Sequence, residues 1–158
     1  MASWRDATAA DVGEVVRLVR GLAEYEKLLH EFVATEADYR AALEAGAIRA
    51  MLAEEAGRAV AVCVYYGTFS TFAGKAGLWI EDIFVEPEHR RRGLARAAFA
   101  EVARRALDEG CAWVEWNVLD WNAPAIAAYR AMGAEPREGW QDMRVSGDAL
   151  KTLAGRSR

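Results

Sequence analysis

The stretch GLWIEDIFVEPEHRRRGLARAAF, residues 77–99, decides the fold of this chain. Its run of apolar and β-branched residues over 78–85 predicts a strand, and the spacing of apolar residues from Leu94 onward predicts an amphipathic helix. A second strand-like run follows over 112–118. Because an intervening helix returns the chain to the edge where it started, this order predicts a parallel pair of strands.

The flanking sequence predicts one mixed α/β domain over residues 1–158, without internal repeats or linkers. Helix caps are expected at Thr8 or Asp11, at Thr35 with Asp38, and at Asn122. Gly57 is free to take the positive φ of a hairpin turn. The expected elements are helices over 8–26, 35–43, 94–110 and 122–133, a hairpin over 48–69, and strands over 78–85, 112–118 and 139–146.

Composition excludes several classes of protein. Hydrophobic residues make up 53% of the 158 and charged residues 28%, as in globular chains. The net charge of −4 argues against a nucleic-acid binder, and no apolar run reaches the roughly 20 residues of a membrane span or forms a signal-peptide core. Cys63 and Cys111 lack a paired spacing, so reduced thiols in a cytoplasmic protein are expected. His30 and His89 stand alone, so no metal site is expected.

Three arginines stand where the last helix of the opening stretch begins. The start of a helix is already positive, so Arg90–Arg92 cost a few tenths of a kcal/mol each. A bound polyphosphate would reverse that cost, and Gly93 would let it approach the backbone. The alternative is a solvated basic turn, with its side chains either extended into water or paired to Glu86 and Glu88. Leu94 stands where an ATP-binding loop needs lysine, and a dinucleotide fingerprint would need more glycines.

The loop EHRRRGLARAAF resembles the acetyl-CoA loop of the GNAT acetyltransferase superfamily, through Arg90, Gly93 and Ala95. The segments GLWIEDIFVEPEHR, NVLDWNAPAIAAYRAMGA and EGWQDMRVSGDALKTLA resemble the spermidine/spermine (diamine) acetyltransferase family, particularly its thialysine-type branch. The resemblance covers nearly the whole chain. It implies a mixed, mostly antiparallel sheet, flanked by helices and splayed between two parallel central strands, 78–85 and 112–118. It also implies acetyl-CoA as cosubstrate, no metal, and a homodimer.

The same resemblance implies positions for the ligands. The expected acetyl-CoA contacts are Ile83, Phe84, Val85, Arg90, Arg91, Arg92, Gly93, Leu94, Ala95, Arg96, Asn122, Ala123, Pro124, Ala125 and Tyr129. The expected amine contacts are Tyr25, Glu26, Glu81, Asp82, Glu115, Trp116, Asn117 and Glu138. Trp79, Trp116 and Trp121 either pack in the core or contact the amine through cation–π interactions.

Two adjacent carboxylates, Glu81 and Asp82, interrupt an otherwise apolar strand. Simple alternation places Trp79, Glu81, Ile83 and Val85 on one face and Leu78, Ile80, Asp82 and Phe84 on the other. A structural salt bridge is one explanation, because an unpaired buried ion costs several kcal/mol. A site for a cationic amine is the other, and the resemblance favours it.

Acetyl transfer to an amine poses two proton problems. An ammonium with a pKa of about 10.4 must lose a proton, which costs roughly 4.6 kcal/mol at pH 7. The resemblance gives Glu81 the role of proton acceptor, directly or through water. It gives Tyr129 the role of acid toward the leaving thiolate, although a lone tyrosine on an alanine-rich helix is more often a core residue. No nucleophilic Ser or Cys is required, so direct transfer is expected.

Three functions stay open on the sequence. The first is acetylation of a small amine, and the second is acetylation of protein N-termini or lysines. The third is a non-catalytic acyl-CoA sensor, which would not need Glu81 and Tyr129. Ser70 and Phe72 stand where polyamine-specific members carry an acidic residue and a tryptophan, which favours a shorter amine such as thialysine or lysine over a long polycation.

Overall fold

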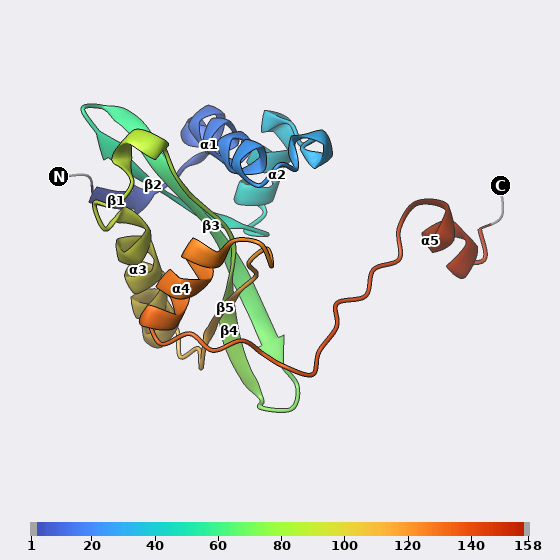
Figure 1. Cartoon of the computed structure of the whole chain (residues 1–158). Helices are drawn as coiled ribbons and strands as arrows, with labels where there is room; N and C mark the ends of the chain where they lie inside the picture. The colour runs from blue at the N-terminus through green and yellow to red at the C-terminus, as the bar shows by residue number, and fades with distance from the viewer. Residues whose placement is uncertain (1–2, 157–158) are drawn as a thin grey trace. The chain divides into compact units, whose positions relative to one another are not determined.

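The computed structural model describes residues 3–156 and divides the chain into two compact units, Met1–Leu119 and Asp120–Arg158 (Figure 1). The first unit carries the sheet and its flanking helices, and the second carries two short helices. Within the described residues, no helix combines the length and the apolar character that crossing a membrane requires. That residues 1–158 form a single domain stays a prediction.

A five-stranded sheet in the order β1-β2-β3-β4-β5 forms the centre of the first unit. All neighbours pair antiparallel except β4 and β5, which are parallel, so the predicted mixed, mostly antiparallel sheet is confirmed. The β4–β5 pairing ends at Ile80 and Trp116, whereas β4 continues to Val85. The two strands therefore part where the splay was expected. The strands are β1 (Ser3–Asp6), β2 (Arg49–Glu55), β3 (Arg58–Ser70), β4 (Lys75–Val85) and β5 (Val114–Trp116).

A β-bulge in β4 corrects the predicted faces of this strand. Val64 of β3 pairs with Asp82, but the next residue, Tyr65, pairs with Ile80, so Glu81 is an extra residue without a partner. Directly opposed residues share a face, and therefore Ile80 lies on the face opposite to Asp82 rather than on the same one. Sequence alternation alone misses this shift because a bulge is defined by the partner strand.

Helices cover both faces of the sheet (Figure 1). On one face lie α1 (Val12–Tyr25) and α2 (Glu36–Glu44), and on the other lies α3 (Leu94–Asp108). Thr8 and Asp11 form a capping box at the 3₁₀ turn η1 (Ala9–Asp11) before α1, and Thr35 and Asp38 form another at α2. A second 3₁₀ turn, η2 (Leu29–Glu31), links α1 to α2. These caps confirm the predicted helix starts.

The apolar core has a layer on each side of the sheet. Leu18 of α1 packs with Val64 and Phe84 on one side. Leu94 of α3 packs with Val60 and Val85 on the other. Each fully buried aliphatic side chain of this size contributes about 1.5–3 kcal/mol. The two layers fix β4 between α1 and the start of α3.

Gly77 sets the start of the parallel pairing. A Cβ at this position would lie 2.0 Å from Nε1 of Trp113, so glycine alone fits without displacing the indole. Leu78 N–H then donates to the carbonyl of Trp113 at 3.1 Å. The close approach lets β5 join the edge of β4.

The second unit contains α4 (Ala123–Ala131) and α5 (Gly147–Leu153). Asn122 caps α4 by accepting a hydrogen bond from the Ala125 N–H, as predicted. The predicted strand over 139–146 is wrong, because these residues form no ladder. Consequently β5 is the last strand of the sheet among residues 3–156, not a central one. The sequence also gave no signal for β1 or α5.

Candidate active site

The loop between β4 and α3 is open to an anion. It runs through the 3₁₀ turn η3 (Pro87–His89) to Gly93, which is the N-cap of α3 with a φ of 80°. Within the described chain, α3 has no side-chain cap and no acidic residue in its first turn. The first N–H groups of the helix therefore lack a side-chain acceptor, and a phosphate fits the donors that are left.

The arginines of this loop are held in different ways. The Arg90 Nε–H donates to the carbonyl of Val85 at 2.9 Å, and its guanidinium lies 4.9 Å from the centre of the Tyr25 ring. Arg92 pairs with Glu55 of β2 at 3.3 Å. Arg91 is exposed and has a φ of 59°. Among the described ion pairs, none joins these arginines to Glu86 or Glu88, so that part of the alternative is wrong, whereas the exposed Arg91 is as a solvated basic turn would have it.

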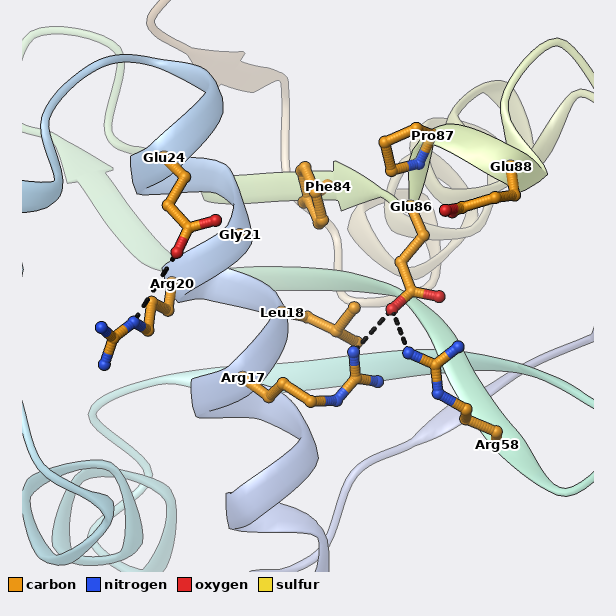
Figure 2. Close-up of a pocket in the computed structure, with 10 residues that line it drawn as sticks. All are labelled: Arg17, Leu18, Arg20, Gly21, Glu24, Arg58, Phe84, Glu86, Pro87 and Glu88. Carbon is orange, nitrogen blue, oxygen red and sulfur yellow. Dashed lines mark hydrogen bonds and ion pairs between the residues drawn. The ribbon is translucent and has the colours of Figure 1, made fainter.

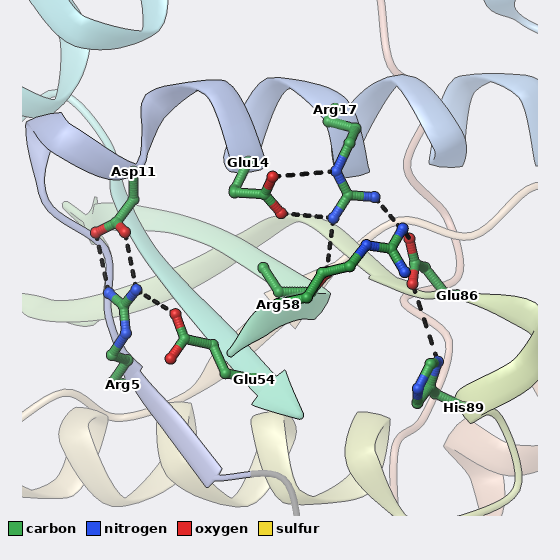
Figure 3. A network of polar contacts seen from close by, with 9 residues as sticks. Arg5, Asp11, Glu14, Arg17, Glu54, Arg58, Glu86 and His89 are labelled. Atoms are coloured by element: carbon green, nitrogen blue, oxygen red, sulfur yellow. Dashed lines mark hydrogen bonds and ion pairs between the residues drawn. The ribbon is translucent and has the colours of Figure 1, made fainter. Parts of the chain in front are cut away.

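Glu86 instead anchors the loop to the rest of the first unit (Figure 3). Its Oε1 accepts hydrogen bonds from Arg17 of α1 and Arg58 of β3, both at 2.6 Å. Arg17 is fixed in turn by Glu14 at 2.6 Å. Glu86 is 8% exposed, so its charge is compensated inside the protein. The start of the loop is therefore tied to both α1 and β3.

A small pocket of about 350 Å³ lies beside Glu86 (Figure 2). Its charged residues have both signs, and Arg20 pairs with Glu24 at 3.8 Å while Arg17 and Arg58 pair with Glu86. Because these charges compensate one another, the pocket favours neither an anionic nor a cationic ligand. Glu86, Glu88 and His89 lie close enough to share a metal ion, but Arg17 and Arg58 already balance the charge of the Glu86 carboxylate through its Oε1.

A larger pocket, which we call the acidic pocket, lies between α1, α2 and β4 and has a volume of about 530 Å³. It brings together three of the predicted amine contacts, Glu26, Glu81 and Asp82. Within the part of the chain that the structure describes, no Lys, Arg or His lines it. The other acidic and aromatic lining residues are Glu31, Asp38, Phe32 and Tyr39. The arrangement is suited to a cation.

Glu81 and Asp82 differ in their surroundings. Oε2 of Glu81 accepts hydrogen bonds from the Tyr66 hydroxyl at 3.2 Å and from Nε1 of Trp79 at 2.9 Å. Burial raises the pKa of Asp82 to about 7, and the negative charges of Glu81 and Glu26 add to this effect. Burial also raises the pKa of Glu26. Neither Glu81 nor Asp82 forms a salt bridge among the described ion pairs, so the structural explanation for them is wrong.

The end of α1 connects the loop with the acidic pocket. Tyr25 lies against Arg90, and the next residue, Glu26, lines the pocket. On β5, Glu115 pairs in register with Trp79, whereas the Trp116 ring packs against Phe99 with their centres 4.6 Å apart. Trp116 therefore has a packing role.

The remaining predicted residues lie outside the acidic pocket. Ile83 is half-buried on β4, and Phe84, Val85 and Leu94 belong to the core. Ala95, Arg96 and Asn117 are exposed. In the second unit, Ala123, Pro124, Ala125 and Tyr129 belong to α4, and Glu138 lies between its helices.

Sequence reasoning missed several residues of this site. Tyr66 donates to Glu81, and Tyr39, Glu31 and Asp38 line the acidic pocket; Trp79 was named, but not as the donor to Glu81 that it is. Tyr66 of β3 pairs with Trp79 of β4. The sequence could have placed Tyr66 near Glu81 only if the register of these two strands had been known. No local pattern marks the others, because α2 and η2 reach β4 only through tertiary packing.

Comparison with known proteins agrees with this geometry. The chain is 36% identical to a thialysine N-epsilon-acetyltransferase of Bos taurus, with 96% of each chain covered. It is 38% identical to an L-ornithine N5-acetyltransferase of Arabidopsis thaliana over 57% of this chain and 40% of the relative. An integron cassette protein of V. cholerae shares the fold with a TM-score of 0.80, at 19% identity, covering 97% of each chain.

The acetyltransferase (GNAT) family matches residues 14–134, which include α1, the sheet from β2 to β5, the arginine loop and α4. The match therefore contains both the anion-ready start of α3 and the acidic pocket. These residues and the similarity over the full chain identify the chain as an N-acetyltransferase that belongs to the GNAT family.

Proposed function

We propose that this enzyme transfers an acetyl group from acetyl-CoA directly to the primary amine of a small cationic substrate. One observation carries the proposal. A pocket lined by carboxylates and by no described basic residue lies next to a basic, uncapped helix start in the same unit. Tyr25, against Arg90, and Glu26, in the acidic pocket, are consecutive residues. They link a helix start suited to an anion with a pocket suited to a cation.

The arginine loop would hold the cosubstrate. Acetyl-CoA, when bound, supplies the activated acetyl thioester. Arg91 is exposed and Gly93 leaves open space above the α3 N-terminus, so side-chain and main-chain donors can bind a pyrophosphate together. Beyond Ile80, β4 has no ladder partner in β5, and we propose that its N–H groups around Ile83–Val85 polarise the thioester carbonyl.

The acidic pocket would hold the amine. Its volume of about 530 Å³ suits a molecule the size of a diamine or a lysine-like amino acid. The relatives named for thialysine and L-ornithine act on molecules of this kind, so these two compounds are the first substrates to test. Spermidine represents the polyamines in the same comparison.

Two residues are proposed for the proton transfers. As the resemblance implies, Glu81 takes a proton from the ammonium, and Tyr129 gives one to the sulfur that leaves. The hydrogen bonds from Tyr66 and Trp79 fix the Glu81 carboxylate for this role. A tyrosine hydroxyl has a pKa near 10 and stays protonated at neutral pH, which suits a proton donor.

Acetylation of protein N-termini or lysines is the second candidate. An open pocket between α1, α2 and β4 would admit a lysine side chain as readily as a free amine. A non-catalytic sensor is not favoured, because the unpaired carboxylates would have no purpose there.

Release of thiol from acetyl-CoA, measured with thialysine, L-ornithine, lysine, spermidine and short peptides, tests the function. We expect saturable turnover with at least one small amine. No turnover with any amine would refute the proposal, and faster turnover with peptides would favour the second candidate. Tyr129→Phe should lower kcat about tenfold or more while acetyl-CoA still binds. A wild-type kcat in this variant would remove Tyr129 from the mechanism.

We also propose a cytoplasmic homodimer, which the cysteine pattern and the resemblance favour. Cys63 is buried with a raised pKa and neither cysteine forms a disulfide, in keeping with a reducing compartment. Sedimentation equilibrium of the purified chain tests the dimer, and a monomer at micromolar concentration would contradict it.

A further inference from the structure

Because of the bulge in β4, two adjacent carboxylates line the acidic pocket, where a regular strand would place only one. Regular alternation would turn Glu81 and Asp82 to opposite faces, but both line the acidic pocket. Asp82 lies opposite Val64 of β3 and faces Tyr39 of α2, whereas Glu81 is at the exposed rim. The two adjacent groups can therefore contact the same amine and still have different roles.

The environments of the two carboxylates suit different roles. Glu81 is held by two neutral donors, Tyr66 and Trp79, which fix the position of its carboxylate at the rim where an ammonium would bind. Asp82 accepts no hydrogen bond among those of the described residues and faces only acidic or phenolic groups. The ionisable groups that share its pocket are Glu26 from the end of α1, Glu31 from η2, Asp38 and Tyr39 from α2, and Glu81 from β4.

We infer that Asp82, rather than Glu81, accepts the proton of the bound ammonium, and that Glu81 binds and orients that ammonium. This inference rests on the proposed function and reassigns one role within it. An N–H bond of the ammonium breaks, and an O–H bond forms on Asp82. The lone pair left on nitrogen forms the new bond to the acetyl carbon as the carbon–sulfur bond breaks, and the sulfur takes a proton from Tyr129. The nitrogen then loses its second proton, which restores the Tyr129 hydroxyl through water, and Asp82 later returns the first proton to water.

The chemistry of Asp82 supports this order of events. A general base works best when its pKa lies near the working pH, and burial with its acidic neighbours raises the pKa of Asp82 to about 7. The transfer from an ammonium with a pKa of about 10.4 is then less unfavourable than a transfer to an ordinary carboxylate. Binding of the cation beside Glu81 also brings the proton within reach of Asp82.

The first test compares three isosteric variants in pH–rate profiles between pH 5.5 and 9, at saturating acetyl-CoA and with the best amine of the panel. We expect an acid limb in the wild-type enzyme. Asp82→Asn should remove that limb and lower kcat about a hundredfold. Glu81→Gln should keep the limb and raise the amine KM about tenfold. Glu44→Gln changes an exposed carboxylate at the end of α2, outside the acidic pocket, and as the control it should keep the limb.

The inference is overturned if Asp82→Asn keeps the wild-type limb, or if Glu81→Gln is the variant that loses it. Absence of turnover by the wild-type enzyme with every amine would instead refute the proposed function, and this inference with it. Circular dichroism and acetyl-CoA binding show whether each variant is folded, so a loss of kcat is not confused with a loss of structure.

A second test does not depend on activity. Carbon NMR of protein labelled at the aspartate carboxyl carbon should show one resonance that titrates near pH 7, and Asp82→Asn should abolish it. Addition of spermidine, as a cationic probe, should shift that titration to lower pH because a nearby positive charge favours the carboxylate. If no aspartate titrates between pH 6 and 8, or if the probe leaves the titration unchanged, the inference is wrong.

Discussion

Glu86 and Asp82 lie near the same end of β4, the first buried and the second half-buried, yet among the described ion pairs only Glu86 has counter-ions. Two arginines bind Glu86 at 2.6 Å each. Asp82 has acidic neighbours, and its pKa is raised to about 7 by burial and by their charges. The protein thus compensates the charge of Glu86 with its own arginines and provides no counter-ion for Asp82 among the described ion pairs.

The difference separates a structural carboxylate from a functional one. A buried ion that the fold needs is paired within the fold, because leaving it alone costs several kcal/mol. A buried carboxyl without a partner lowers stability and is retained where a ligand supplies the missing charge. Glu86 accordingly fixes the arginine loop, and we propose that the charge missing at Asp82 is supplied by the cationic substrate.

The same isosteric change should have opposite effects at the two positions, and the larger effect is at Glu86. Glu86→Gln leaves Arg17 and Arg58 without their shared anion, so we expect it to lower the free energy of unfolding by about 2–4 kcal/mol. Urea denaturation at pH 7.5 measures this loss. Glu88→Gln, on the exposed side of the same turn, is the matched control and should change stability by less than about 0.5 kcal/mol. Equal effects of the two variants would remove the distinction.

Asp82→Asn should stabilise the protein at alkaline pH. Burial raises the pKa of Asp82 from 3.8 to about 7, so over this interval the folded protein holds a proton that the unfolded chain has lost. The stability linked to that proton is complete below about pH 4 and is lost as the pH rises through 7. We expect the variant to exceed the wild type by about 1–2 kcal/mol at pH 8. The gain should shrink toward pH 4, and a gain that is constant with pH would contradict the shifted titration.

The smallest effect is expected when one hydrogen bond to Glu81 is removed. Tyr66→Phe removes the hydrogen bond from the hydroxyl at 3.2 Å and leaves the Trp79 bond in place. An exposed hydrogen bond of this kind contributes about 0.5–1 kcal/mol, so the amine KM should rise about two- to fivefold with little change in stability. Steady-state kinetics with the amine as varied substrate measure this KM. A change in KM as large as that of Glu81→Gln would mean that Tyr66 contacts the amine itself.

The sequence predicted the elements whose signals are local. Thr35 and Asp38 form their capping box because the bonds lie within one turn, and Gly57 takes a φ of 79° in the hairpin as expected. The β4–α3 unit was also predicted, since the strand and helix periodicities are strong on both sides of Gly93. By contrast, β1 has four residues and depends on pairing with β2, so no local pattern marks it.

The candidate site was predicted in part for the same reason. Glu81 and Asp82 were identified from their unusual place in an apolar strand, but their shared pocket depends on the bulge, which the register of β3 creates. The burial of Asp82 depends on α2, whose approach is tertiary. The expected strand over 139–146 has alternating character and still forms no ladder. Periodicity therefore identifies strand-like segments and leaves their partners open.

The ion pair between Arg92 and Glu55 means that the arginine loop already has a resident anion before any ligand arrives. Glu55 also lies 3.0 Å from Nε2 of His89, so one side chain at the β2–β3 hairpin contacts two residues of the loop. Under the proposed function, a phosphate that binds Arg92 would have to displace the Glu55 carboxylate. The contribution of Arg92 to acetyl-CoA affinity would then depend on how strongly the β2–β3 hairpin holds Glu55 in its present pair.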